Sequence, residues 1–269
     1  MIKKLILIIT CAVVLNADLN TKIKNLLGEE EYRTHLNLIN YIFKDQSIYY
    51  NNEQVNYPLL TQTLKDNGLL KLDLSQNNQI EVTFQFTKNP TKSLKILKDT
   101  LRSLGYYYYF TQEAIANQDG FIWNIILKTE SAINPLMLSK SLSLLNCDVT
   151  DIKREGNYKW YYSINSNNSE IYKALDLITN NELRLKKPAK PYMIKVNNLP
   201  NLTVNSNSGN RWHPKIVFYD NELNIIEIFK EDSLHRNLTI QVPDYTKYIK
   251  IDDLYNLANL RRGISITKE

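Results

Sequence analysis

The sequence predicts an α+β protein built from two parts. The stretch 79–165 reads twice as strand, helix, strand, and its two helices begin at Asn89-Pro90 and Asn134-Pro135. Beyond Pro191, apolar residues recur with a period of two in short runs. Since βαβ crossovers are right-handed, the paired halves predict a ferredoxin-like βαββαβ unit, a four-stranded antiparallel sheet backed by two helices. The later runs predict a small C-terminal β-sandwich.

A length of 269 residues suits two domains of ordinary size. The run Lys186-Lys187-Pro188-Ala189-Lys190-Pro191 has the composition of a linker. We therefore expect a secretory signal peptide at 1–17, N-terminal helices with an edge strand at 18–78, the ferredoxin-like domain at 79–185, the linker at 186–191 and the sandwich at 192–269.

The first 17 residues have the pattern of a secretory signal. Lys3 and Lys4 precede an apolar run from Leu5 to Leu15, and Ala17 stands before polar residues. The run is shorter than the roughly 20 residues that span a bilayer. We expect cleavage after Ala17, a periplasmic location and no integral membrane span in the mature chain. A lipid anchor on Cys11 and an uncleaved anchor are the alternatives.

The mature chain is close to neutral. Without Lys3 and Lys4, 31 Lys and Arg face 28 Asp and Glu, so the formal net charge falls from +5 to +3. This is too little positive charge to predict nucleic-acid binding. Cys147 is then the single thiol, and we expect it to be a buried apolar residue.

The N-terminal elements are expected from helical spacing and turn residues. Apolar residues in 19–44 recur as on one helix face, with a break at Gly28, and a third helix runs from Pro58 to Gly68. The leucines of Leu70–Leu74 then alternate with polar residues, which predicts a half-buried strand. A turn at Asn77-Asn78 makes it an added edge strand of the central sheet.

The central unit and the C-terminal part follow from the same patterns. Asn89 and Asn134 can each accept hydrogen bonds from the first turn of their helix, where Pro90 and Pro135 lack an N–H group. A further short helix is expected at 171–177. The expected central strands are 80–87, 106–111, 121–129 and 159–165, with helices at 90–105 and 135–147.

The tyrosine run 106–109 is the most unusual local feature. On a strand, alternate rings point to opposite faces of the sheet. Exposed rings at Tyr106 and Tyr108, beside Tyr161, would suit a protein interface or a glycan platform, because tyrosine combines apolar area with a hydroxyl. The alternative is that the N-terminal helices cover that face.

A second candidate surface lies in the C-terminal part. Trp212, with Arg211, His213 and Tyr219 nearby, could line a site for a sugar or a peptide. The alternative is that Trp212 packs in the core.

Patterns typical of catalytic or metal sites are absent from the sequence. His35, His213 and His235 do not have zinc-site spacing, and no phosphate-binding loop or nucleophile elbow occurs. We therefore expect no catalytic residue, cofactor or metal. The stretch Asp119–Ile125 resembles the aromatic signature of RNA-recognition modules, but Asp119 replaces its basic residue and Ile122 replaces a small one. We expect no nucleic-acid partner.

Two stretches carry a family resemblance. The stretches Leu-Lys-Asp-Asn-Gly-Leu-Leu from Leu64 and Leu-Gly-Tyr-Tyr from Leu104, with the signal-like start, are similar to uncharacterised periplasmic proteins of low-GC Gram-negative bacteria. The resemblance covers mainly residues 1–165 and implies a compartment without a mechanism.

These observations lead to one functional expectation and one alternative, with an enzyme that the sequence patterns do not reveal as a third hypothesis. We expect a non-enzymatic periplasmic scaffold or accessory subunit of an envelope assembly, for example a flagellar motor or secretion apparatus, that docks other envelope proteins. The alternative is a glycan- or peptidoglycan-binding periplasmic protein that uses Trp212 or the tyrosines.

Overall fold

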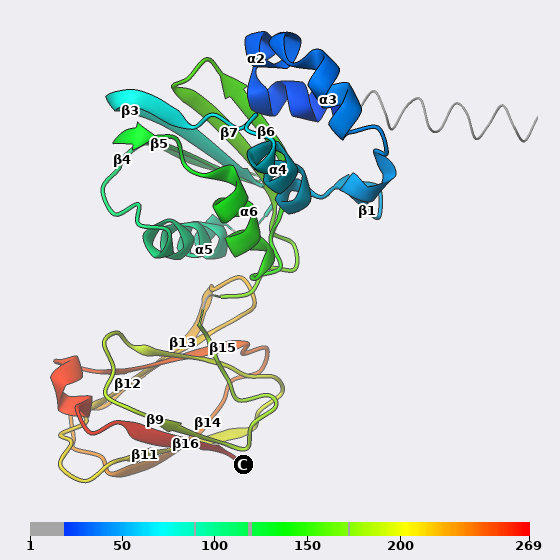
Figure 1. Ribbon diagram of the computed structural model, residues 1–269. Coiled ribbons are helices and arrows are strands. Elements are labelled where there is room, and N and C mark those ends of the chain that lie inside the picture. Colours follow the sequence, from blue (N-terminus) through cyan, green and yellow to red (C-terminus); the bar gives the residue numbers. More distant parts are fainter. Residues whose placement is uncertain (1–18, 89, 118–119, 172) are drawn as a thin grey trace, which may run out of the picture. The chain divides into compact units, whose positions relative to one another are not determined.

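The chain has an α+β fold in two compact units (Figure 1). The computed structural model describes residues 19–88, 90–117, 120–171 and 173–269, so the signal predicted at 1–17 lies outside the described residues. The first unit ends at Glu170 and the second begins at Ile171. The predicted linker 186–191 lies within the second unit.

The first unit is organised around a five-stranded sheet. Its strands lie in the order β4 (Phe110–Asn117), β5 (Gly120–Ser131), β3 (Asp73–Phe86), β7 (Lys159–Asn165) and β6 (Asp148–Glu155). β3 pairs antiparallel with β5 but parallel with β7. The prediction of four antiparallel strands was therefore wrong. The missed strand is β6, which takes the outer edge and turns back at Gly156, so that β7 enters the sheet between β6 and β3.

The predicted edge strand at Leu70–Leu74 and its turn are also wrong. β3 is one strand of 14 residues, and its pairing with β5 shifts register between Asp73 and Asn78. Ser75 has a φ of 63°, which places the irregularity before the asparagines and leaves Asn77 and Asn78 extended. The chain therefore continues in one direction where the sequence indicated a hairpin.

Three helices pack over one face of this sheet: α4 (Tyr57–Asp66), α5 (Pro90–Ser103) and α6 (Pro135–Ser143). The side chain of Asn134 accepts from the N–H groups of Leu136 and Met137 at 3.1 and 3.2 Å, which confirms the predicted cap. Asn89, the matching predicted cap, lies outside the described residues. Beneath the helices, Phe84 and Tyr162 stack with their ring centroids 5.4 Å apart.

In the described part of the chain, the other face of the sheet keeps solvent-accessible side chains. Along β3, Val82 and Phe84 are fully buried, whereas Thr83 between them is half-buried and Gln85 is exposed. The N-terminal helices are at 19–27, α2 (Glu29–Thr34) and α3 (Leu36–Ile42), and the first of them is linked to β6. There Lys22 Nζ lies 3.3 Å from Asp151 Oδ1. We call the face of the sheet that carries Thr83 and Gln85 the open face.

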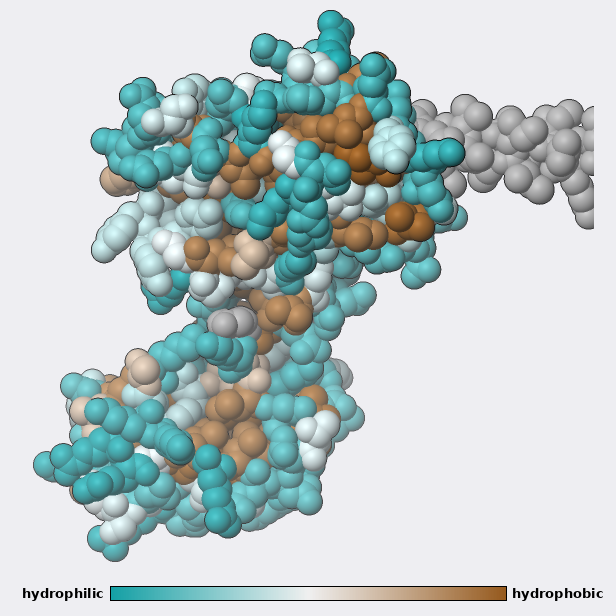
Figure 2. All heavy atoms as spheres, viewed as in Figure 1, coloured by the Kyte–Doolittle hydropathy of each residue, from teal (hydrophilic) through white to brown (hydrophobic). Residues whose placement is uncertain are grey.

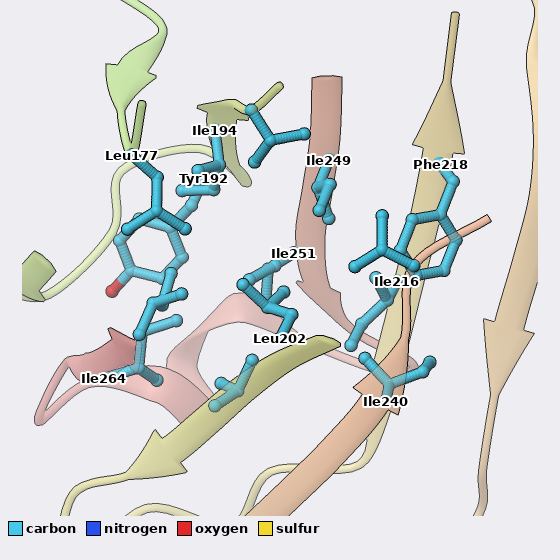
Figure 3. Close-up of a cluster of buried hydrophobic side chains, with 14 of the residues drawn as sticks. Leu177, Tyr192, Ile194, Leu202, Ile216, Phe218, Ile240, Ile249, Ile251 and Ile264 are labelled. Carbon is cyan, nitrogen blue, oxygen red and sulfur yellow. The ribbon is translucent and has the colours of Figure 1, made fainter. Parts of the chain in front are cut away.

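The second unit consists of two sheets. One has the order β13 (Ile225–Lys230), β12 (Pro214–Tyr219), β15 (Tyr248–Asp253), β10 (Tyr192–Lys195), β8 (Leu175–Asp176), and the other β14 (Asn237–Gln241), β11 (Asn201–Ser206), β16 (Ile264–Lys268), β9 (Glu182–Leu185). Figure 3 shows Ile251 and Ile216 from the first sheet pointing toward Leu202 and Ile240 from the second, within one buried cluster. A helix was predicted at 171–177, but residues 175–176 form strand β8, which pairs with β10, so the prediction is wrong there.

Candidate docking surface

The tyrosine run is a loop between α5 and β4, not the predicted strand, because β4 begins at Phe110. Tyr107 and Tyr108 are 63% and 91% exposed, while Tyr106 and Tyr109 are half-buried. Two neighbouring rings therefore point to solvent, instead of alternating across a sheet. We call residues 106–109 the tyrosine loop.

The two half-buried rings hold the loop in place. The hydroxyl of Tyr106 accepts from the backbone N–H of Asn134 at 3.2 Å, and burial raises the pKa of Tyr106, against the smaller opposing effect of that bond. Tyr109 meets Trp123 edge to face, with 5.3 Å between the ring centroids. Trp123 also donates from Nε1 to Thr111 Oγ1 at 3.1 Å. The exposed rings thus stand on a fixed base.

β4, which follows the loop, is the outer strand of the sheet, and all eight of its residues are exposed. Phe110 pairs with Ile126 and Ile115 pairs with Ile122, so these four side chains share the open face. Phe110 is 80% exposed and Ile115 is 41% exposed. The loop and this strand together form a continuous surface, which we call the β4 edge.

A groove lies between the tyrosine loop and α5. It encloses about 490 Å³ and is lined by Thr91, Leu94, Lys95, Lys98, Asp99, Arg102, Tyr106, Tyr107 and Tyr109. Asp99, the one acid among these lining residues, pairs with Lys95 at 3.0 Å. Lys98 Nζ lies 5.9 Å from the ring centroid of Trp123. The groove therefore combines aromatic walls with excess positive charge.

Tyr161 does not join the other predicted tyrosines. It lies half-buried on β7, and β5 and β3 separate that strand from β4. The hydroxyl of Tyr161 donates to Glu155 Oε2 at 3.2 Å, and Lys153 Nζ lies 5.8 Å from its ring centroid. The structure brings together Tyr106 and Tyr108 but not Tyr161.

The predicted residues of the second unit are also separated. Trp212 is fully buried in the core between the sheets, and its Nε1 donates to the carbonyl oxygen of Asp252 at 2.9 Å. Arg211 is exposed, while Tyr219 packs against a different small cluster that contains Leu223 and Tyr248. Trp212 therefore stabilises the core and offers no surface to a ligand.

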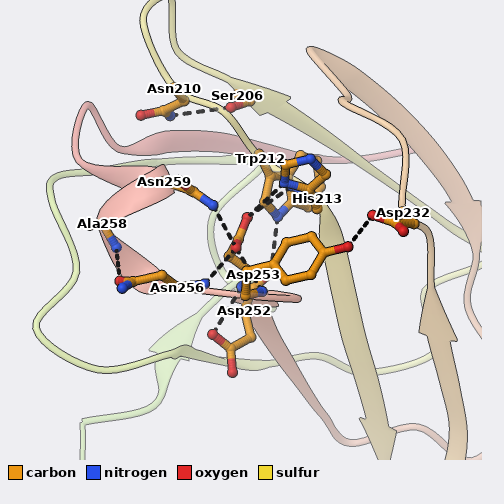
Figure 4. Close-up of polar contacts among 11 residues, drawn as sticks. Ser206, Asn210, Trp212, His213, Asp232, Asp252, Asp253, Asn256, Ala258 and Asn259 are labelled. Atoms are coloured by element: carbon orange, nitrogen blue, oxygen red, sulfur yellow. Dashed lines mark hydrogen bonds and ion pairs between the residues drawn. The ribbon is translucent and has the colours of Figure 1, made fainter.

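Asp253 of the second unit has a fully buried side chain with several hydrogen-bond donors around it (Figure 4). Oδ1 accepts from the N–H groups of Tyr255 and Asn256 and from Nδ2 of Asn259, at 2.9, 2.8 and 2.9 Å, and Oδ2 accepts from the N–H of His213 at 2.8 Å. Burial alone would raise the pKa of Asp253, but these donors outweigh it and hold the pKa below its usual range. The carboxylate fixes the turn after β15.

One arrangement was missed from the sequence, a Glu231, Ser233 and His235 cluster on an exposed turn. His235 Nε2 lies 2.9 Å from Ser233 Oγ and 3.0 Å from Glu231 Oε2. A serine-histidine-acid triad instead uses the two opposite ring nitrogens. This cluster lacks that geometry. Among the residues that the structure places, no three His, Cys, Asp or Glu side chains gather as a metal site.

Apolar side chains also gather around the N-terminal helices, as Figure 2 shows, where Leu38 on α3 is 41% exposed. A helix satisfies its own backbone hydrogen bonds, whereas β4, as an outer strand, pairs with a neighbouring strand on one side only. Neither the β4 edge nor the basic groove was predicted from the sequence. The signal available was the spacing of Lys95, Lys98 and Arg102, which puts them on one side of a helix.

In the described ranges, no helix is both long and apolar enough to cross a membrane. Comparison of the chain with models of protein families, with curated proteins and with solved structures finds no match.

Proposed function

We propose that the protein is a non-enzymatic periplasmic scaffold or accessory subunit of an envelope assembly, such as a flagellar motor or secretion apparatus, and that it docks an extended segment of a partner protein on the β4 edge. One observation carries this proposal: β4 is exposed along its whole length at the edge of the sheet. The periplasmic location rests on the predicted signal and on the family resemblance.

Edge strands recruit partners through a known mode. An extended peptide adds to the sheet by main-chain hydrogen bonds, while side-chain pockets give specificity. Proteins usually protect such edges with charges, proline or coverage by another element. β4 has one charged residue, Glu113, and no proline. Tyr108 in the tyrosine loop and Phe110 at the start of β4 add the aromatic area that is enriched in protein interfaces.

The two-part architecture supports a scaffold role. We class the first unit as a ferredoxin-like arrangement with one inserted strand, because β3, β4 and β5 keep the adjacency that the split βαβ plan requires. We class the second unit as a small β-sandwich, since both of its sheets contribute to one core. Each unit has its own core and can therefore present its own surface.

Site-specific photo-crosslinking in the cells that produce the protein tests this function. A benzoylphenylalanine at Tyr108 should give a discrete crosslinked product that contains an envelope protein. Tyr245 is a matched control, because it is 89% exposed against 91% for Tyr108 but lies in the second unit. Equal products from both positions, or none from Tyr108, would contradict docking at the β4 edge.

The groove favours the second candidate function, glycan or peptidoglycan binding. Tyr106, Tyr107 and Tyr109 line it together with Lys98 and Arg102, and tyrosine rings suit sugar rings. This function predicts that the full chain sediments with cell-wall sacculi and that Tyr107→Ala weakens the sedimentation. A Trp212→Phe variant serves as control, since its side chain is in the core.

A further inference from the structure

We propose that the segment docked on the β4 edge carries acidic residues at the end that reaches the tyrosine loop, where Lys98 and Arg102 bind its carboxylates. This inference rests on the proposed docking function and names the chemistry of the partner. It commits to a polypeptide with an apolar, β-forming stretch next to a cluster of Asp or Glu.

The β4 edge and the basic groove are contiguous. Tyr109 lines the groove, and the next residue, Phe110, begins β4. Trp123 connects the two further, because its ring contacts Tyr109 and its Nε1 donates to Thr111 on β4. An extended segment that pairs with β4 and continues past Phe110 therefore reaches the groove within a few residues, at about 3.3 Å per residue.

The charges of the groove are not neutralised from within. Lys95 is paired with Asp99, but in the described part of the chain neither Lys98 nor Arg102 has an acidic side chain within ion-pair distance. Both side chains belong to exposed residues. Burial raises the pKa of Tyr109, and the nearby guanidinium of Arg102 lowers it by a smaller amount. A carboxylate ligand complements this pair of cations.

The observations favour a polypeptide over an acidic glycan. A sugar acid can use the tyrosines and the two cations, but it does not pair with the outer edge of β4 as another strand does. A peptide uses both surfaces, since the strand supplies N–H and C=O groups at the spacing of another strand.

Synthetic peptides and the full chain provide the test. The probes are blocked nonapeptides in which Thr-Val-Thr-Val-Thr-Val is preceded or followed by three Glu, three Gln or three Lys. Affinity is read by fluorescence anisotropy at low and high salt, and the binding site is read by hydrogen exchange of the amides of residues 110–117. We expect a Glu peptide to bind about tenfold more tightly than its Gln counterpart at low salt, from two partly screened ion pairs. The Lys peptides should bind most weakly, and high salt should reduce these differences.

Paired variants assign the effect to the groove. Lys98→Gln/Arg102→Gln should lower the affinity for the Glu peptide to that for the Gln peptide. Lys187→Gln/Lys190→Gln removes the same charge from exposed positions of the second unit and should change neither affinity.

The outcomes separate the two claims. If the Glu and Gln peptides bind equally and both protect residues 110–117, the acidic selection is overturned while docking on β4 stands. If no peptide protects these amides, the docking function itself fails. If soluble peptidoglycan fragments displace the Glu peptide at lower concentration than unlabelled Glu peptide does, the groove is a glycan site and the inference is overturned.

Discussion

Asp253→Asn should destabilise the second unit by an amount that depends on pH. Asn keeps the size of the side chain but replaces one acceptor oxygen with a donor group. If the amide oxygen takes the place of Oδ1, its three hydrogen bonds survive, and the new NH2 group faces the N–H of His213. One buried hydrogen bond is lost and the others no longer go to a charged acceptor, so we expect a cost of about 2–4 kcal/mol at pH 7.

The pH dependence follows from the direction of the pKa shift. The folded-state pKa of Asp253 lies below that of an unfolded Asp, which is about 3.9. The stabilisation is therefore complete above about pH 4 and is lost as the pH falls through the folded-state pKa. The difference in free energy of unfolding between the wild type and Asp253→Asn should therefore become smaller over that same acidic range.

Urea unfolding followed by NMR measures this difference for the second unit alone. Of the three tryptophans, Trp212 is in the second unit and the other two are in the first, so its indole N–H resonance reports the second unit. Asp244→Asn is the matched control, because Asp244 is exposed in the same unit. Two results would refute the reasoning. One is that Asp253→Asn is as stable as the wild type at pH 7, and the other is that the difference in free energy of unfolding stays constant down to pH 3.

Three further predictions concern the first unit. Gly120→Ala should destabilise it by more than about 2 kcal/mol in urea titrations, because Gly120 has a φ of 134° and an added Cβ would lie 2.0 Å from the carbonyl oxygen of Phe86. Gly156→Ala, at a φ of 60° in open space, should cost about 1 kcal/mol, and equal effects would contradict this account. Burial raises the pKa of Cys147 to about 12, so iodoacetamide at pH 8 should label this thiol only in urea; rapid labelling of the native protein would show that the thiol is accessible. Phe110→Ser should abolish crosslinking from Tyr108 and leave the free energy of unfolding within about 0.5 kcal/mol of wild type, since Phe110 is 80% exposed; a large loss of stability would place its ring in the core.

The sequence correctly predicted those elements that depend only on residues close together in the chain. The Asn134 cap and Pro135 start α6 as expected, because the cap needs only its own first turn. The hairpin expected at Asn77-Asn78 failed for the opposite reason. Asparagines allow a turn but do not force one, and pairing with β5 over the rest of β3 keeps the chain extended.

The candidate surface was predictable only in part. The tyrosines were singled out for their composition, but their exposure depends on where β4 begins, which the sequence pattern placed four residues too early, at Tyr106. Trp212 was named as a candidate surface residue, with packing in the core as the alternative, and the packing of two sheets buries it. The β4 edge was missed because strand order, and therefore which strand is outermost, depends on long-range pairing.

Hydrogen exchange tests docking on the β4 edge most directly. It is measured on the full chain in two states, as the purified protein and as the protein bound to isolated cell envelopes. β13 is the internal control, since it is also an outer strand with exposed isoleucines but belongs to the second unit. Docking on the β4 edge predicts that the amides of residues 110–117 exchange more slowly in the envelope-bound protein, while those of 225–230 exchange at the same rate as in the purified protein. Unchanged exchange in β4, or equal slowing in both strands, would contradict it.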